Sequence, residues 1–72
     1  MNPSTIEEYL ATLNEVALST LSNECEAYYK SGVAPLDSTV RRLSQHFLEV
    51  NTHVGFVAVC LAVWRYIARR GA

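Results

Sequence analysis

Apolar residues recur along the second half of the chain at intervals of four and three. From Leu36 to Ala68 these intervals run 4-3-4-3-4-3-4-3-4 without interruption. A period of about 3.5 residues is typical of a helix that lays one continuous seam against a neighbouring helix, whereas a strand alternates at every second residue. The pattern therefore predicts one long helix over about residues 37–70. Its seam consists of Leu36, Val40, Leu43, Phe47, Val50, Val54, Val57, Leu61, Trp64 and Ala68.

A shorter helix is predicted upstream, over about residues 4–31. Its start carries two overlapping S/T-x-x-E capping boxes, which begin at Ser4 and at Thr5. Its apolar positions are spaced 4-3-4-4-4-3, which departs from a strict heptad and favours a straighter helix. Gly32 is suited to the left-handed position just past the helix end.

The link between the two predicted helices is short, and Asp37 or Ser38 is expected to cap the second one. Long helices joined by about four to six residues are antiparallel neighbours. We therefore expect an all-α helical hairpin that forms a single domain over residues 1–72.

One neighbouring helix cannot cover all the apolar surface of the long helix. Every position from Val54 to Val63 is apolar or glycine, and half of the whole chain is hydrophobic. A helix that is apolar all round is normally surrounded by protein. We therefore expect a homodimer in which two hairpins form a four-helix bundle. The expected dimer interface consists of Val40, Leu43, Phe47, Val50, Val54, Val57, Leu61 and Trp64.

Charge is divided unevenly along the chain. The net charge is -1, but residues 1–33 sum to -4 and residues 34–72 to +3. The small net charge argues against a protein that coats nucleic acid. In an antiparallel hairpin, Glu7 and Glu8 lie toward the end of the long helix that carries Arg65.

The long helix is expected to extend about 10 Å past the first helix and to expose an aromatic and basic cluster. Trp, Tyr and Arg dominate binding hot spots, so the cluster is a candidate partner-binding surface. The alternative interpretation is that the arginines complement the helix dipole and that Trp64 belongs to the core. The candidate residues are Arg65, Tyr66, Arg69 and Arg70, with a second candidate surface at Arg41 and Arg42 that a solvated helix face would also explain.

The two cysteines predict a reducing compartment. If the chain folds back near Ala34, Cys25 lies beside Leu43 and Cys60 lies near Glu8, too far apart for a disulfide. We expect two reduced thiols in a cytoplasmic protein. The most apolar run has eleven residues, about half of a bilayer core, so a membrane span is not expected.

The sequence offers little for catalysis, and we expect neither an enzyme nor a bound cofactor or metal. His46, His53 and Cys60 are seven residues apart, whereas metal ligands on one helix lie three or four apart. The three glycines are widely separated, which excludes a phosphate-binding loop. The serines of the helical pattern, Ser19, Ser22 and Ser44, lack an obvious histidine–aspartate pair.

The layout of an acidic first helix, a short Gly/Pro turn and a longer heptad helix, with PLDSTVRRLSQHFLEVNTHVGF after the turn, resembles small early proteins of temperate Pseudomonas phages. The resemblance is to the anti-quorum-sensing type, which is a dimeric helical hairpin. It implies a protein in the bacterial cytoplasm that binds and inhibits or sequesters a host protein, such as a LuxR-type transcriptional regulator or the pilus assembly ATPase.

A second family with this layout is the helical-hairpin co-chaperones of type III secretion systems. A co-chaperone would use its exposed apolar face for a fixed heteromeric partner and would be monomeric or aggregated when purified alone. A phage-type inhibitor would be a soluble dimer.

Overall fold

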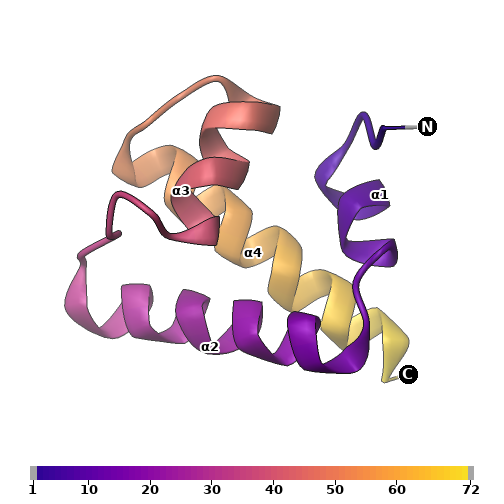
Figure 1. Cartoon of the computed structure of the whole chain (residues 1–72). Helices are drawn as coiled ribbons and strands as arrows, with labels where there is room; N and C mark the ends of the chain where they lie inside the picture. Colours follow the sequence, from indigo (N-terminus) through magenta and orange to yellow (C-terminus); the bar gives the residue numbers. More distant parts are fainter. Residues whose placement is uncertain (1, 72) are drawn as a thin grey trace.

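The computed structural model describes residues 2–71, and within that range the chain forms helices and no strand (Figure 1). This confirms the all-α class. The helices are α1 (Ile6–Ala11), α2 (Glu15–Ser31), α3 (Thr39–Leu43) and α4 (His53–Arg70), and a π-helical turn, η1 (Ser44–Leu48), continues α3.

The signals at the helix ends are confirmed. Thr5 caps α1, because its hydroxyl accepts a hydrogen bond from the amide of Glu8 at 3.1 Å. Ser4 donates from its amide and its hydroxyl to the Glu8 carboxylate, and these hydrogen bonds lower the pKa of Glu8. Gly32 ends α2 with φ 73°, and Ser38 caps α3 by accepting from the amide of Arg41 at 3.2 Å.

The prediction of one helix over residues 4–31 is wrong, because residues 12–14 separate α1 from α2. The hydroxyl of Thr12 donates to the carbonyl of Tyr9 at 2.6 Å, and Asn14 begins α2 by accepting from the amide of Ala17 at 2.8 Å. Thr and Asn side chains compete in this way with the backbone ladder of a helix interior.

The prediction of one helix over residues 37–70 is also wrong. The chain breaks at residues 49–52, and the axis of α4 is bent by 101° from that of residues 39–48. Glu49 adopts the left-handed conformation, with φ 57°. Two hydrogen bonds hold the break, from the Ser44 hydroxyl to the carbonyl of Val50 (2.7 Å) and from Arg41 to the side chain of Asn51 (3.0 Å).

The structure therefore replaces the elongated hairpin with a folded-back arrangement. The described residues span 28 × 27 × 18 Å, whereas a straight helix over residues 37–70 would alone be about 50 Å long. In Figure 1, α1 and the α3–η1 segment both lie on one side of the layer formed by α2 and α4.

The expected antiparallel neighbours are present, although they are α2 and α4 instead of two long helices. Glu15 at the start of α2 pairs with Arg70 at the end of α4, and Tyr28 near the end of α2 meets His53 at the start of α4. The expected attraction between the acidic N-terminal part and the basic C-terminal end is confirmed by Glu7 and Arg69, 3.2 Å apart.

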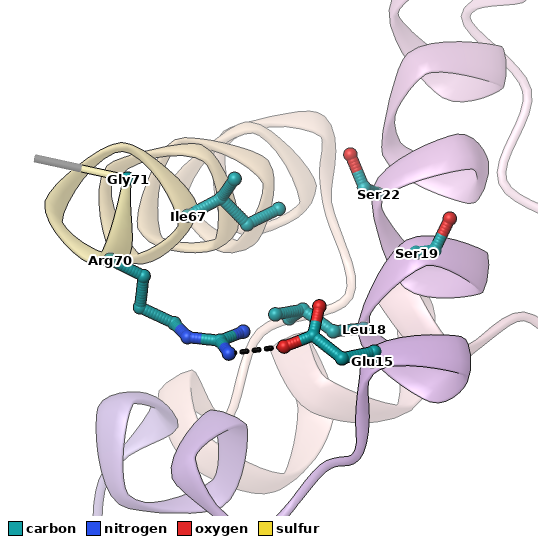
Figure 2. A pocket seen from close by; sticks show the side chains of 7 residues that line it. All are labelled: Glu15, Leu18, Ser19, Ser22, Ile67, Arg70 and Gly71. Atoms are coloured by element: carbon teal, nitrogen blue, oxygen red, sulfur yellow. Dashed lines mark hydrogen bonds and ion pairs between the residues drawn. The ribbon is translucent and has the colours of Figure 1, made fainter.

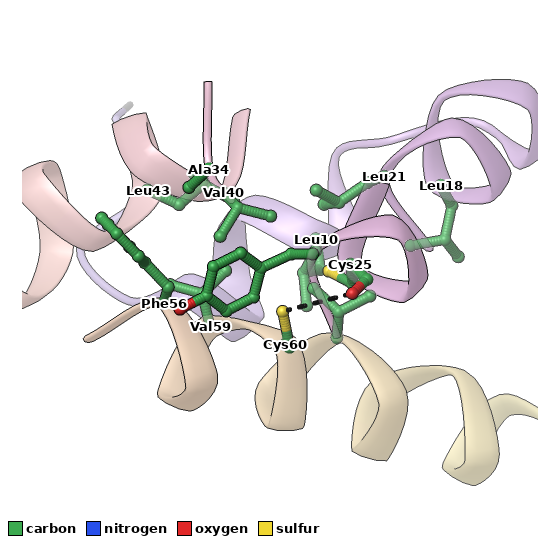
Figure 3. Close-up of a cluster of buried hydrophobic side chains, with 12 residues drawn as sticks. Leu10, Leu18, Leu21, Cys25, Ala34, Val40, Leu43, Phe56, Val59 and Cys60 are labelled. Carbon is green, nitrogen blue, oxygen red and sulfur yellow. Dashed lines mark hydrogen bonds between the residues drawn. The ribbon is translucent and has the colours of Figure 1, made fainter. Parts of the chain in front are cut away.

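A single cluster of side chains from all four α-helices forms the core (Figure 3). Tyr28 meets the ring of Phe56 edge-on, with 5.6 Å between centroids. Glu24 of α2 reaches the start of α3, where its carboxylate accepts from the amide of Val40 at 2.7 Å. The cluster comprises Leu10, Leu18, Leu21, Cys25, Tyr28, Ala34, Val40, Leu43, Phe56, Val59, Cys60 and Val63.

The face that α4 buries is not the predicted seam. Its buried residues are Gly55, Phe56, Val59, Cys60 and Val63, whereas the seam residues of α4 are exposed or half-buried. This helix is apolar on two faces, and the chain's own core uses only one of them.

Within residues 2–71, no helix alone has both the length and the apolar composition needed to cross a membrane. Residues 39–48 and 53–70 meet that criterion only when taken together across their 101° bend.

Candidate functional site

Apolar side chains form an exposed surface along the outer face of α4. This surface, the α4 stripe, consists of Val54, Val57, Leu61 and Trp64, together with Tyr29 of α2. Val54 is 76% exposed, Leu61 42% and Tyr29 78%. The Tyr29 ring lies edge-on to the Trp64 indole, with centroids 6.0 Å apart. An aromatic pair held at the surface in this way is a typical anchor of a protein interface.

A groove of about 230 Å³ runs beside the α4 stripe, between the end of α2 and α4. Tyr29, Val57, Leu61 and Trp64 line it, so the stripe and the groove are one continuous surface. Its lining is almost wholly apolar. The polar side chains in the lining are Tyr28 and His53, whose hydroxyl and Nδ1 are hydrogen-bonded to each other.

The structure divides the predicted dimer-interface residues into three groups. Val40 and Leu43 are 1% and 5% exposed, because they fill the chain's own core and are not available to a second subunit. Phe47 is half-buried, with its ring 6.1 Å from that of Tyr9, and Val50 is 39% exposed. The remaining four, Val54, Val57, Leu61 and Trp64, all lie on the α4 stripe.

The predicted overhang of basic residues is wrong, because the end of α4 lies against α1 and the start of α2. Arg69 pairs with Glu7, and Arg70 pairs with Glu15 across the space between α4 and α2 (Figure 2). Arg70 also lies 5.8 Å from the centroid of the half-buried Tyr66 ring. Arg69 and Arg70 therefore hold the end of α4 against α1 and α2 through specific ion pairs that the sequence did not predict.

The arginines of the second predicted surface differ in their surroundings. Arg41 clamps the break, since its guanidinium donates to the carbonyl of Ala34 and to Asn51 and lies 5.1 Å from the Phe56 ring. Arg42 is exposed and donates to the hydroxyl of Thr39 at 3.2 Å.

Arg65 differs from Arg69 and Arg70, the other arginines at the end of α4. It is exposed, lies next to Trp64, and forms no ion pair with any residue in the range 2–71. At the end of α4 it is therefore the arginine whose charge the described part of the chain leaves uncompensated, and the two arginines of the second predicted surface also donate only to neutral groups.

A larger hollow of about 460 Å³ lies between α2 and the end of α4 (Figure 2). Its polar groups are the Glu15–Arg70 pair and the hydroxyls of Ser19 and Ser22. The lining contains no histidine, cysteine or second carboxylate that would activate a serine. The third serine considered, Ser44, is fully buried and donates to the carbonyl of Val50, so its role is structural.

The prediction that the two cysteines lie far apart is wrong, although both are free as expected. The break after η1 shifts the pairing so that Cys25 of α2 faces Cys60 of α4, and the Cys60 sulfur lies 3.9 Å from the carbonyl oxygen of Cys25. A hydrogen bond between the thiols, together with burial, raises the pKa of Cys25, and the same hydrogen bond lowers the pKa of Cys60.

No three metal-ligating side chains gather at one point within the described part of the chain. His53 is hydrogen-bonded to Tyr28, and the His46 ring packs edge-on against the Phe47 ring, with 4.6 Å between centroids.

Sequence reasoning missed the Tyr28–His53 pair and the role of Tyr29. The partner that makes Tyr29 part of a surface is Trp64 of α4, and only the fold brings these two rings together.

No protein-family model, curated protein or solved structure matches this chain.

Proposed function

We propose that this chain is a non-catalytic protein-interaction module that forms a homodimer through the α4 stripe, and that the dimer binds and inhibits a bacterial host protein. The observation that carries the proposal is the second apolar face of α4, which the fold leaves exposed after its own core is complete. Aromatic and aliphatic side chains gathered on one exposed helix face are typical of an interface.

Charge supports a second copy of this chain as the occupant of the stripe. Exposed Glu49 precedes α4, and exposed Arg65 lies about 18 Å along α4 from its first residue, His53. Neither Glu49 nor Arg65 forms an ion pair within residues 2–71. When two α4 helices lie antiparallel about a two-fold axis, Arg65 of one copy faces the start of α4 in the other, next to its Glu49. Each dimer then gains two such pairs, one at each end of the apolar contact.

A charge swap tests this arrangement. We expect Glu49→Arg and Arg65→Glu each to raise the dimer dissociation constant by about tenfold, because like charges then face each other twice. The double variant restores opposite charges and should return the constant to near the wild-type value. Sedimentation velocity over a dilution series measures it. The antiparallel dimer would be contradicted if the wild type, the two single variants and the double variant had equal dissociation constants. It would also be contradicted if the double variant dissociated more readily than either single variant.

The host protein is the second part of the proposal. It follows from the resemblance to phage inhibitors, which places the dimer in the bacterial cytoplasm and suggests a LuxR-type regulator or a pilus assembly ATPase as the target. Because that resemblance was drawn on a two-helix layout, the binding surface must be found on the fold itself. Val33 and Leu36, which are 63% and 84% exposed in the link between α2 and α3, lie outside the α4 stripe and offer such a surface.

Affinity capture from bacterial lysate, followed by mass spectrometry, tests this second part. We expect Leu36→Asp to lose a protein that the wild type retains. Val16→Asp, which changes an equally apolar and 75% exposed residue of α2, should keep it. Identical captured proteins for all three chains would remove the link between α2 and α3 as the binding surface.

The α4 stripe also fits the co-chaperone alternative, because an exposed apolar face suits a fixed heteromeric partner equally well. The two functions differ in the state of the isolated protein. A co-chaperone purified alone would be monomeric or aggregated, and it would become a stable single species only with its partner.

A further inference from the structure

Two free thiols meet in the core, at the centre of the contact between α2 and α4. Cys25 and Cys60 are 0% and 3% exposed, and the sulfur of Cys60 lies 3.9 Å from the carbonyl oxygen of Cys25. Figure 3 shows the Cys60 sulfur directed at the backbone of Cys25. The two side chains come from different helices and are 35 positions apart in the sequence, so a bond between them would join the two longest helices of the fold.

The two cysteines differ in how they meet solvent. Cys60 is one of the residues that line the groove beside the α4 stripe, although it is only 3% exposed, so the groove is the side from which a reagent approaches it. Cys25 lies behind it and does not line the groove. The hydrogen bond from Cys25 lowers the pKa of Cys60, which favours its thiolate, and the thiolate is the reactive form in disulfide exchange.

We propose that Cys25 and Cys60 form a reversible oxidation site, at which a small disulfide such as oxidised glutathione converts the two thiols into an intrachain disulfide between α2 and α4. The Cys60 thiolate attacks one sulfur of the reagent, whose S–S bond breaks and releases one glutathione thiolate. Cys25 then gives its proton to water and attacks the Cys60 sulfur, which displaces the second glutathione. Two electrons pass from the cysteines to the reagent.

The bond would change the protein in two ways. It would close a loop that contains all of α3, η1 and the break at residues 49–52, which restricts the unfolded chain and stabilises the fold. It would also fix the Cys60 side chain at the base of the groove. Both cysteines belong to one chain, but the groove that leads to Cys60 is continuous with the α4 stripe, so the oxidation takes place in chains that are not paired through that stripe.

The test treats the reduced, folded protein with excess oxidised glutathione. We expect a mass loss of two hydrogen atoms, no thiols left for alkylation after unfolding, and a midpoint of thermal unfolding raised by several degrees that dithiothreitol reverses. Cys25→Ser should instead stop at a glutathione adduct on Cys60. Cys60→Ser should stay unmodified while folded, because Cys25 is shielded.

Three results would overturn the proposal. The first is a wild-type protein that keeps a stable glutathione adduct, and the second is one that forms only disulfides between chains. The third is a folded protein that stays fully reduced while the same protein in urea reacts. The wild-type result decides in each case, so a variant that folds poorly does not leave the question open.

Discussion

Gly55 is the residue at which the folded-back arrangement depends most directly on the absence of a side chain. A Cβ there would lie 2.2 Å from the hydroxyl oxygen of Ser44 and 2.5 Å from a methyl carbon of Val50. Ser44 is fully buried and holds the break through its hydrogen bond to Val50. The small residue therefore lets η1 and the break lie directly on α4.

We predict that Gly55→Ala lowers the free energy of unfolding by about 1–3 kcal/mol, because the added methyl group overpacks the contact. In one continuous helix the same change would raise it by about 0.5–1 kcal/mol, since alanine favours helix. The sign therefore distinguishes the two folds in urea unfolding. Gly71→Ala is the control, because a Cβ there meets its nearest atom at 3.7 Å. A stabilised Gly55→Ala variant would contradict the observed packing.

Much of the residue-level detail could be predicted from the sequence, because helix caps depend on neighbours in the chain. Thr5, Gly32 and Ser38 act as their local sequence indicates. Asn14 also carried a local signal, since an asparagine followed by glutamate suits a helix start, but the surrounding apolar periodicity concealed it.

Among the elements, α4 shows why a regular seam was misleading. Apolar positions spaced by three and four are satisfied equally by one long helix and by two helices that meet at an angle. Residues 49–52 determine that the chain forms two helices instead of one. Glu49 turns the chain in the left-handed conformation, and hydrogen bonds from Ser44 and Arg41 stabilise the turn. These contacts come from residues brought together only by the bend itself, so periodicity could not reveal them.

The short helix α3 depends on α2 for its position. The Glu24 carboxylate accepts from the amide of Val40 and supplies negative charge at the start of α3, in addition to the Ser38 cap. We predict that Glu24→Ala lowers the free energy of unfolding by about 1–2 kcal/mol, the range for a lost cap.

Guanidinium or urea unfolding of Glu24→Ala measures that loss. Glu26→Ala is the matched control, because Glu26 pairs only with Lys30 at the surface of the same helix, and exposed pairs of this kind contribute less than about 0.5 kcal/mol. Equal losses in the two variants would mean that Glu24 does not support α3.

In the molecule as a whole, the excess of apolar residues between Val54 and Val63 correctly predicts that part of α4 stays exposed after the core is formed. The particular residues could be predicted only in part. Val54, Val57, Leu61 and Trp64 are on the surface, while other expected interface residues close the chain's own core. The basic end of α4 was misjudged because α1 folds back to meet it, and that contact depends on the break at residues 12–14.

The most direct test of the α4 stripe as a self-association surface is the mass of the purified chain by sedimentation equilibrium at micromolar concentration. We expect twice the 8.0 kDa of one chain for the wild type and for Val16→Glu, and a single-chain mass for Leu61→Glu with unchanged helical content. A wild-type protein that remains at 8.0 kDa across the micromolar range would contradict that expectation.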